Sequence, residues 1–521
     1  MVPEQEVSLD LSKITFEKAR EVAKTLVRYL KESSQTGAGP VWWVRGKEVF
    51  TGNQVLPLIH GDEYGDNLLN AIKGARKYVF MTAWALTPSF RLQRSSSTQP
   101  EANPTSDSII GALYERMKAG IIVRVLVWRN LLSIVDRETN MSLELLRAHD
   151  IPTRMAPAPP APVLHQKTVV IDGLVAFCGG MEPTYLGGDR WDTKEHRFPD
   201  PHKFRPRHPS KDWKDLWHDV QVRIEGPAVT AIQQNFVERW DEGAPQRDED
   251  EIPQLDWSRR TRGGSSVEAQ VVRTIPRRET WDDTFTSGEG EPLHRGSNRG
   301  RSDTEDYTTL ESYGRAIVNA KRFIYIENQY FTCTFLIELA ARRLKSNPGL
   351  SIVILIPRES ELHVPEDAPQ SAKSKTSFFR TFIGENIDAA KVVADLRKAA
   401  PERVFVGYRT NNEGKDVYVH AKTMIVDDTF AIVGSANLSY RSMFRTDQEL
   451  SIAWIDPKGK SVATFRRTLW AEHLALSEDD LPKREDSAKS MAALWKDRSM
   501  DKDWKKKRIG EWSLPQSSKN V

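Results

Sequence analysis

The chain has 521 residues, of which 39% are hydrophobic, so it is long enough to bury one large core or two of ordinary domain size, and disorder is not expected. Its 75 Lys and Arg residues are nearly balanced by 72 Asp and Glu, and a formal net charge of +3 excludes a simple polycation made to bind nucleic acid. Two cysteines, Cys178 and Cys333, lie in apolar or aromatic stretches, which argues against a disulfide-stapled secreted domain and against a cysteine zinc cluster.

Residues 1–50 predict a helical extension rather than a targeting signal. The segment begins MVPEQEVSLD and contains no apolar run suited to a signal peptide, and no later stretch reaches the roughly 20 apolar residues of a spanning helix. An apolar stripe over residues 14–31 predicts a helix that packs rather than anchors. We therefore expect a cytoplasmic protein that is peripheral at membranes, while export without a signal peptide stays open.

Residues 51–257 alternate between helix and strand signals. Residues 71–84 read as the end of an amphipathic helix that runs into a buried strand, residues 120–127 as a short β-branched strand, and residues 163–180 as a strand pair. Residues 93–107 and 197–212 are polar and rich in turn formers, so we expect surface loops there, near the site.

A second copy of the same pattern follows a Gly-rich connecting segment, residues 258–303, and occupies residues 304–475. The matching segments are 316–329, 349–356 and 418–435. The repeat is far longer than that of a solenoid, so it indicates two copies of one domain. We predict an α/β fold in which two homologous α/β/α halves, each a mixed sheet flanked by helices, pack with pseudo-two-fold symmetry into one bilobal unit.

Each matched strand pair carries a histidine and a lysine two residues apart, His165 with Lys167 and His420 with Lys422. Residues i and i+2 of a strand point to the same face, so a pseudo-two-fold axis would bring both pairs to one cavity. One histidine can attack phosphorus, the other can protonate the leaving oxygen, and the lysines can hold charged oxygens, with no metal required. The doubled pattern predicts a site for phosphoryl transfer.

An aspartate follows each histidine by seven positions, Asp172 and Asp427, and both are counted with the candidate catalytic residues. They lie at Asp-Gly and Asp-Asp pairs typical of hairpin turns. This position favours a structural role over direct chemistry.

Small residues after each motif predict a phosphate cradle formed by Gly179, Gly180, Ser435 and Asn437. The small residues let backbone N–H groups approach a phosphate closely, and the amide adds a neutral donor. Because Glu182 stands where the second half has Asn437, we expect the cradle to be asymmetric.

The doubled motif resembles that of the phospholipase D superfamily, in both halves and in order, over about residues 52–454. GGDRWDTKEH at 187–196, the LWHDV segment at 216–240, IYIENQYF at 324–331 and GSANLSYRSM at 434–443 resemble eukaryotic-type members. These segments favour the phosphatidylcholine-cleaving branch over the short nucleases and cardiolipin synthases.

The resemblance implies that His165 is the nucleophile that forms a phosphohistidine and that His420 is the general acid, with exchanged roles left open. It also implies that Asp219 and Glu449 hydrogen-bond the two imidazoles, without telling which serves which. Water would release phosphatidic acid from the intermediate, and a primary alcohol in its place would give transphosphatidylation.

Cofactor and membrane contact stay open. In some plant relatives the segment matching 189–196 lies near calcium, so a divalent cation is conceivable although no ligands are assigned. No C2, PX or PH domain is recognisable ahead of the core. In the C-terminal extension, residues 476–521, the segment WKKKRIGEW at 504–512 is a candidate membrane contact, with a solvated tail as the favoured alternative. Residues 202–208 are a second candidate, or simply a charged loop.

The sequence thus predicts an enzyme that cleaves phosphatidylcholine-like lipids at a membrane surface, without a nucleic-acid partner, and with one chain sufficient for one site. Trp84 and Trp128 end buried strands and are expected in the core, with contact to choline or an acyl chain as the alternative. Two other functions stay open: a nuclease of the same superfamily, with a basic groove and steep salt dependence, and a non-catalytic phosphate- or lipid-binding scaffold.

Overall fold

The computed structural model describes most of the chain, and every structural statement below concerns that part. The described residues are 17–35, 41–87, 89–94, 105–128, 143–156, 163–197, 214–242, 252, 266–276, 305–358, 389–457, 460–481, 488–503, 505 and 507–512. The predicted loop at 197–212, with the candidate contact at 202–208, lies outside them except for Arg197, as does the Gly-rich stretch 287–303.

The first half is built on a mixed sheet whose central strands are almost completely buried. Three parallel strands are followed by antiparallel ones. In spatial order they are β4 (Thr153–Ala156), β3 (Ile122–Trp128), β2 (Tyr78–Ala83), β6 (Thr168–Ile171), β7 (Val175–Gly179), β9 (Val220–Glu225) and β1 (Phe50–Ile59). Runs such as YVFMTA are apolar on both faces because helices cover both sides of this sheet.

The second half repeats this order strand for strand. Its parallel and antiparallel pairings are those of the first half. The strands are β14 (Val404–Thr410), β13 (Ser351–Leu355), β12 (Phe323–Asn328), β16 (Lys422–Val426), β17 (Phe430–Gly434), β18 (Asp447–Ile455) and β10 (Val267–Ile275). The prediction of two homologous α/β halves is confirmed.

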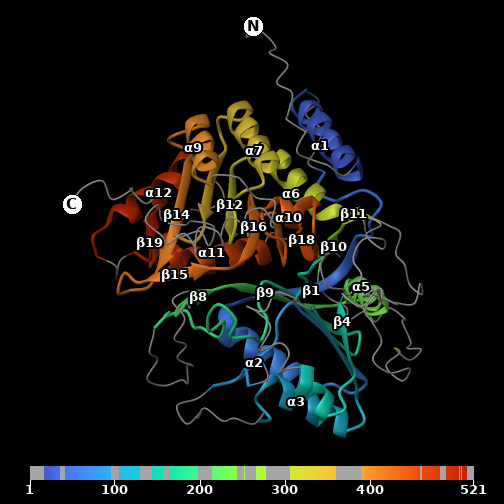
Figure 1. Ribbon diagram of the computed structural model, residues 1–521. Helices are drawn as coiled ribbons and strands as arrows, with labels where there is room; N and C mark the ends of the chain where they lie inside the picture. Colours follow the sequence, from blue (N-terminus) through green and yellow to red (C-terminus); the bar gives the residue numbers. More distant parts are fainter. Residues whose placement is uncertain are drawn as a thin grey trace, which may run out of the picture.

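Strands β1 and β10 join the two sheets edge to edge, with a register shift between Phe50 and Asn53. Strand β10 comes from the predicted connecting segment 258–303, so that segment contributes to the second sheet. The two halves lie one above the other in Figure 1, the first in blue and green and the second in yellow to red.

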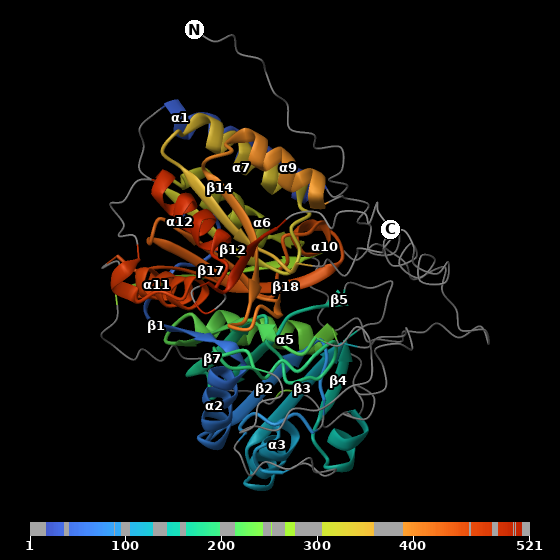
Figure 2. The same cartoon turned by 90° about the vertical axis from the view of Figure 1, so that its left-hand side faces the viewer.

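Helices cover the outer faces of both sheets and fill the space between them. On the first half lie α2 (His60–Lys73), α3 (Ile109–Lys118) and α5 (Val229–Glu242). On the second half lie α6 (Thr308–Asn319), α7 (Thr334–Ser346), α9 (Ala389–Ala399), α10 (Tyr440–Phe444), α11 (Lys460–Leu474) and α12 (Ala488–Met500). Helix α1 (Glu17–Gln35), from the predicted N-terminal extension, packs on α6. Figures 1 and 2 show α7 and α9 at one end of the molecule and α2 and α3 at the other.

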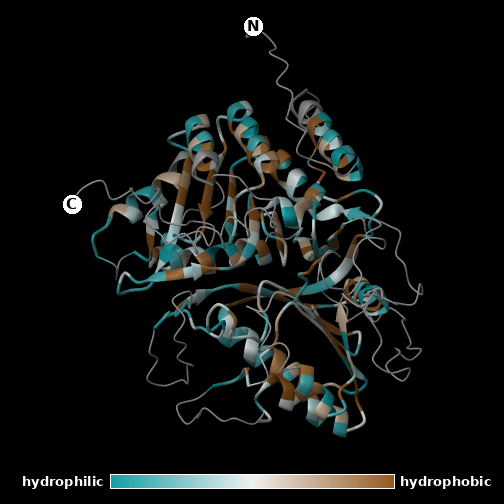
Figure 3. Ribbon diagram, viewed as in Figure 1, coloured by the Kyte–Doolittle hydropathy of each residue, from teal (hydrophilic) through white to brown (hydrophobic). Residues whose placement is uncertain are grey.

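Three apolar clusters stabilise these layers. One lies under the outer helices of each half, and the third lies between the sheets and takes side chains from both halves. Phe80 and Trp240 of the first half belong to this central cluster, together with Tyr325 and Trp470 of the second. Figure 3 shows the hydrophobic residues concentrated along the strands and on inward helix faces. The shared cluster holds the halves together, because parting them would expose its large side chains to water.

The C-terminal segment completes the second sheet. Strand β19 (Ile509–Glu511) pairs antiparallel with β14, and the side chains of Lys507 and Trp512 are buried. Residues 509–511 are therefore part of the second sheet and not a solvated tail, while Lys505 is exposed, and the membrane contact predicted for residues 504–512 stays a prediction. Among the described residues, none of the helices is long and apolar enough to cross a membrane.

Candidate active site

Each motif is preceded by one short strand that pairs with a strand of the opposite half. Strand β5 (Val163–Leu164) leads into His165 and pairs parallel with β18 of the second half. Strand β15 (Asp416–Val419) leads into His420 and pairs parallel with β8 (Trp217–His218) of the first half. Each histidine also donates its backbone N–H across the interface, His165 to Gln448 O at 3.0 Å and His420 to His218 O at 2.8 Å. Both motifs therefore meet at the junction of the halves.

The carboxylates that orient the imidazoles are exchanged between the halves. Nδ1 of His165 lies 2.9 Å from Glu449 Oε1, and Nδ1 of His420 lies 2.6 Å from Asp219 Oδ2. Each bond leaves Nε2 of its ring for chemistry and supports positive charge on the imidazole. The sequence left this pairing open, and the structure assigns Glu449 to the first-half histidine and Asp219 to the second-half histidine.

The two lysines lie beside their histidines, at the spacing that predicted a shared face. Lys167 donates to His165 O at 2.9 Å, and Lys422 donates to His420 O and to Gln329 Oε1, the latter at 3.1 Å. Burial lowers the pKa of Lys422 to about 7. An anion that entered the site would favour the charged form of both ammonium groups.

A further cation, Arg190, was missed in the sequence. Its side chain is 5% exposed, its guanidinium lies 5.1 Å from the centre of the Trp217 ring, and its Nη1 donates to Glu182 Oε1 at 2.7 Å. Its charge is among the causes that lower the pKa values of His420 and Lys422. The signal was one arginine in GGDRWDTKEH, whose partner eight residues earlier is visible only in the fold.

Glu182 serves the site as an anchor for this cation. Its Oε2 accepts the backbone N–H groups of Trp84 and Ala85 at 2.9 and 3.1 Å and lies 3.9 Å from Lys167 Nζ. Burial opposes its ionisation, yet Lys167 and Arg190 more than offset this, so the pKa of Glu182 lies below its usual range. The expected asymmetry of the cradle is thus an ion pair in one half and an amide in the other.

Aromatic rings flank both imidazoles. Trp84 is half-buried, stacks on Trp128 at 5.7 Å and meets the edge of the His165 ring at 6.2 Å. Trp217 lies 4.9 Å from the His420 ring and 4.9 Å from Tyr418. Trp84 is therefore more than a core residue, because it packs against a motif histidine.

Three residues of the predicted phosphate cradle have a different role in the structure. A Cβ on Gly180 would lie 2.1 Å from Asp219 Oδ1, and one on Gly179 would lie 2.5 Å from Val220 O. These glycines make room for β9 and its carboxylate. Ser435 likewise donates its hydroxyl to Glu449. These three residues position the carboxylates, which corrects the interpretation that they exist to let phosphate approach.

Asn437 remains a candidate phosphate ligand. Its side chain is 4% exposed and its Oδ1 has no hydrogen-bond partner among the described residues. This oxygen is an acceptor and calls for a donor such as a water, whereas a phosphate oxygen would be bound by the N–H donors of the same amide.

The motif aspartates contact backbone rather than the histidines. Asp172 accepts the N–H groups of residues 76, 77 and 78 at 2.7 to 2.8 Å, and Asp427 accepts those of residues 321, 322 and 323 at 2.7 to 2.9 Å. Both hold the entry of a central strand, β2 or β12, against the hairpin after the motif. These contacts give the two aspartates the structural role expected from their turn position. Counting them with the catalytic residues was wrong, because the contacts described here are to backbone.

Burial and neighbouring cations keep both imidazoles neutral in the free protein. Burial and Lys167 lower the pKa of His165 well below its usual value, while burial, Lys422 and Arg190 do the same for His420. His165 is the more accessible of the two, with 13% of its side chain exposed against 5% for His420. A neutral, accessible imidazole is the form that a nucleophile requires.

The two aspartates of the acidic segment 189–196 are held by groups of the protein itself. Both carboxylate oxygens of Asp189 accept from Arg94, at 2.6 and 2.8 Å, and both residues are fully buried. Asp192 accepts from the backbone N–H groups of Thr193 and Trp217 and bonds His196. Calcium requires six or more oxygen ligands, and these oxygens are already occupied.

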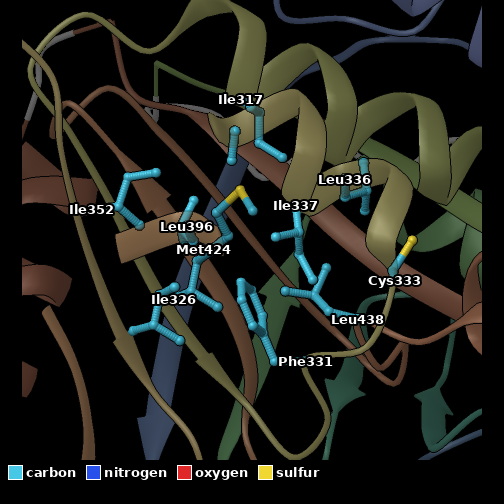
Figure 4. Close-up of a pocket in the computed structure, with 12 residues that line it drawn as sticks. Ile317, Ile326, Phe331, Cys333, Leu336, Ile337, Ile352, Leu396, Met424 and Leu438 are labelled. Atoms are coloured by element: carbon cyan, nitrogen blue, oxygen red, sulfur yellow. The ribbon is translucent and has the colours of Figure 1, made fainter. Parts of the chain in front are cut away.

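A small apolar gap lies apart from this chemistry. It sits between α6, α7 and the second sheet, is lined by Ile317, Phe331, Met424 and Leu438 among others, and has a volume of about 10 Å³ (Figure 4). A space of this size holds at most about one water, and its lining offers that water no polar partner. It is a packing defect of the second core.

Two repeated α/β halves each carry a His–Lys pair, and each supplies the carboxylate that orients the histidine of the other. The family model described as Phospholipase D matches residues 163–338 and 371–510, and the chain belongs to this family.

The relatives are eukaryotic phospholipases D. The chain is 26% identical to phospholipase D alpha 2 of Oryza sativa subsp. japonica, over 82% of this chain and 66% of that protein. It is 26% identical to phospholipase D A of Dictyostelium discoideum, over 80% of this chain and 35% of that protein. The chain thus spans slightly less than two thirds of the length of the first and about a third of the second.

The fold is also that of a solved bacterial structure. Phosphatidylserine synthase of Haemophilus influenzae Rd KW20 superposes with a TM-score of 0.53 at 14% identity, covering 85% of this chain and 90% of that one. This likeness supports the bilobal fold.

Proposed function

We propose that this protein is a phospholipase D that hydrolyses phosphatidylcholine-like glycerophospholipids through a phosphohistidine intermediate. The observation that carries the proposal is the pair of crossed contacts, His165 with Glu449 and His420 with Asp219. Such a pair supplies a nucleophile and an acid on opposite sides of one phosphorus, each held in the tautomer that leaves Nε2 available.

In the first step, Nε2 of His165 attacks phosphorus and the bond from phosphorus to the headgroup oxygen breaks. Protonated His420 gives its proton to that oxygen, so the headgroup leaves as a neutral hydroxyl. In the second step, His420 takes a proton from water, the water oxygen attacks phosphorus and the phosphorus–nitrogen bond breaks. Phosphatidic acid leaves and both imidazoles return to their starting forms.

Substrate binding prepares His420 for its role as an acid. In the free protein burial and then Lys422, Arg190 and Lys167 lower its pKa. A phosphodiester anion placed among these cations would offset their charge, and the pKa of His420 would rise toward neutrality. The three cations then hold the charge that develops on the equatorial oxygens. Proton uptake is thus coupled to substrate binding.

Lipid is favoured over nucleic acid by the relatives' names and by charge. The named homologues are phospholipases D, and the net charge of +3 supplies no strand-tracking excess of cations. The apolar faces of Trp84 and Trp128 suit a choline or acyl group. Since one chain holds both halves, one copy suffices, and we propose that it acts peripherally at membranes.

The test is incubation of the purified protein with phosphatidylcholine vesicles containing ethanol, followed by mass spectrometry of the lipids. We expect phosphatidylethanol and phosphatidic acid from the parent and neither from His165→Ala or His420→Ala. Cleavage of single-stranded DNA or RNA without any lipid product would assign the protein to the nucleases instead. A parent that binds vesicles but converts neither substrate would leave the scaffold hypothesis.

A further inference from the structure

Behind the active site lies a second cluster of side chains that the reaction does not use. His60 at the start of α2, His196 after the GGDRWD segment, His218 on β8 and Glu472 on α11 converge there. One ligand atom from each lies within 4.8 Å of the others. The three histidines are 2% exposed or less.

The histidines are arranged as metal ligands usually are. His196 bonds Asp192 through Nδ1 at 3.1 Å, and His218 bonds Glu327 through Nε2 at 2.9 Å. A carboxylate on one nitrogen fixes the ring and leaves the other nitrogen to bind a metal. Of the other nitrogens, Nδ1 of His218 is buried without a hydrogen-bond partner among the described residues, and Nε2 of His196 faces Glu472 Oε1 at 3.5 Å. His60 differs, because its Nε2 bonds Glu472 directly and its Nδ1 is the nitrogen without a partner among those residues.

The carboxylate of Glu472 lies in the middle of this group. Its Oε2 is 2.8 Å from His60 Nε2, and its Oε1 is 3.5 Å from His196 Nε2 and 2.7 Å from Arg409 Nη2. Three carboxylates, those of Glu472, Asp192 and Glu327, and one guanidinium, that of Arg409, are in direct contact with the cluster. A divalent cation would offset this excess of negative charge.

We propose that His60, His196, His218 and Glu472 form a binding site for a transition-metal ion, with Zn²⁺ the best match. Three imidazoles and one carboxylate are a ligand set that Zn²⁺ prefers, in a closed four-coordinate site. Tetrahedral bonds of about 2.0 to 2.1 Å place ligand atoms roughly 3.4 Å apart, so ligand atoms now separated by more than this, up to 4.8 Å, move closer when the ion binds.

The bound ion would connect the two halves and would hold in place the segment that carries Asp219. Three ligands come from the first half and Glu472 from the second. The two chain neighbours of His218 both contact His420: Trp217 packs on its ring and Asp219 bonds its Nδ1. Along an extended chain, alternate side chains face opposite ways, so His218 faces away from His420. The ion therefore binds on the side of this segment opposite His420 and is not a participant in the reaction.

The competing arrangement has a proton where we place the ion. Burial opposes a charge on His60, but the facing Glu472 raises its pKa above the usual value, so a protonated His60 could hold the cluster together. Only a direct measurement of metal distinguishes the two.

The experiment is metal analysis of the purified full-length protein after equilibration with Zn²⁺ and removal of free ion, by plasma mass spectrometry. We expect about one Zn²⁺ per chain, and after replacement by Co²⁺ the visible absorption of tetrahedral cobalt. Full occupancy should raise Tm by about 3 to 4 °C over the chelated protein. An ion at 1,000 times its Kd adds about 4 kcal/mol to the free energy of unfolding, and the unfolding entropy of a chain of this length converts that free energy into a shift of this size.

Variants connect the ion to these ligands. His60→Gln and His196→Gln should retain less than a tenth of the Zn²⁺, while His149→Gln, which changes a half-buried histidine in edge contact with Tyr114, should retain all of it. Wild-type protein that holds no Zn²⁺ or Co²⁺ after equilibration would overturn the proposal in favour of the proton network. Because the measurement involves no substrate, its failure is distinct from a failure of the proposed lipase activity.

Discussion

Gly180→Ala is expected to disable the active site by displacing Asp219. A Cβ at position 180 would lie 2.1 Å from Asp219 Oδ1, whereas ordinary contact begins near 3.4 Å, so the carboxylate must retreat by roughly 1.3 Å. It cannot do so freely, because Oδ1 accepts the Val220 N–H at 2.8 Å and Oδ2 bonds His420 at 2.6 Å. The methyl group therefore breaks or misaligns the bond that orients His420.

The size of the effect follows from this displacement. An ångström of misplacement at a catalytic group costs about 100-fold in rate, and a hydrogen bond to a charged group contributes about 1.5 to 3 kcal/mol, or roughly 10- to 150-fold. We expect kcat/KM to fall about 100-fold, mostly through kcat, since Asp219 touches the histidine rather than the lipid.

The assay is headgroup release from phosphatidylcholine vesicles, with Gly349→Ala as matched control. A Cβ there has Asn347 Oδ1 at 3.3 Å as nearest neighbour, and the residue has ordinary backbone angles. Combining Gly180→Ala with Asp219→Asn should cost no more than Asp219→Asn alone, because both act through one bond. A folded Gly180→Ala protein with kcat/KM within threefold of the parent would refute this reasoning.

Three other changes test separate parts of the site. Burial raises the pKa of Glu449 to about 7, so it gains a proton and loses its hold on His165 as the pH falls through this value, and the Ser435 hydroxyl opposes this by lowering that pKa. Ser435→Ala should therefore move the acid limb of the pH–kcat/KM profile up by about one unit; an unmoved limb would assign it to another group. Arg190→Met should lower kcat by about 100-fold through loss of one charged donor, and a change in KM alone would make it a binding residue only. Asp172→Asn should lower Tm by about 1 to 3 °C while kcat stays at the parent value, and a large loss of kcat would return this residue to the chemistry.

Much of the fold was predictable because its evidence is repeated and local. The two copies carry the same apolar runs and the same His-x-Lys spacing, and period-two alternation alone places His165 and Lys167 on one face. The turn position of Asp172 and Asp427 likewise indicated their structural role.

What escaped prediction depends on contacts between the halves. His165 and Glu449 are 284 positions apart and His420 and Asp219 are 201 apart, so no local pattern reveals which carboxylate serves which imidazole. The role of Gly180 was misassigned because the carboxylate it makes room for, that of Asp219, lies in a distant segment of the same half. The three histidines and one glutamate of the rear cluster come from four distant segments and carry no spacing signal.

Trapping the covalent intermediate tests the central claim most directly. The protein would be mixed with phosphatidylcholine, quenched with denaturant at alkaline pH within milliseconds to seconds, digested and analysed by mass spectrometry. We expect a phosphatidyl group on the peptide that contains His165 and none in His165→Ala. An adduct only on His420 would exchange the roles of the two histidines, and full lipid turnover with no adduct on either would contradict the mechanism.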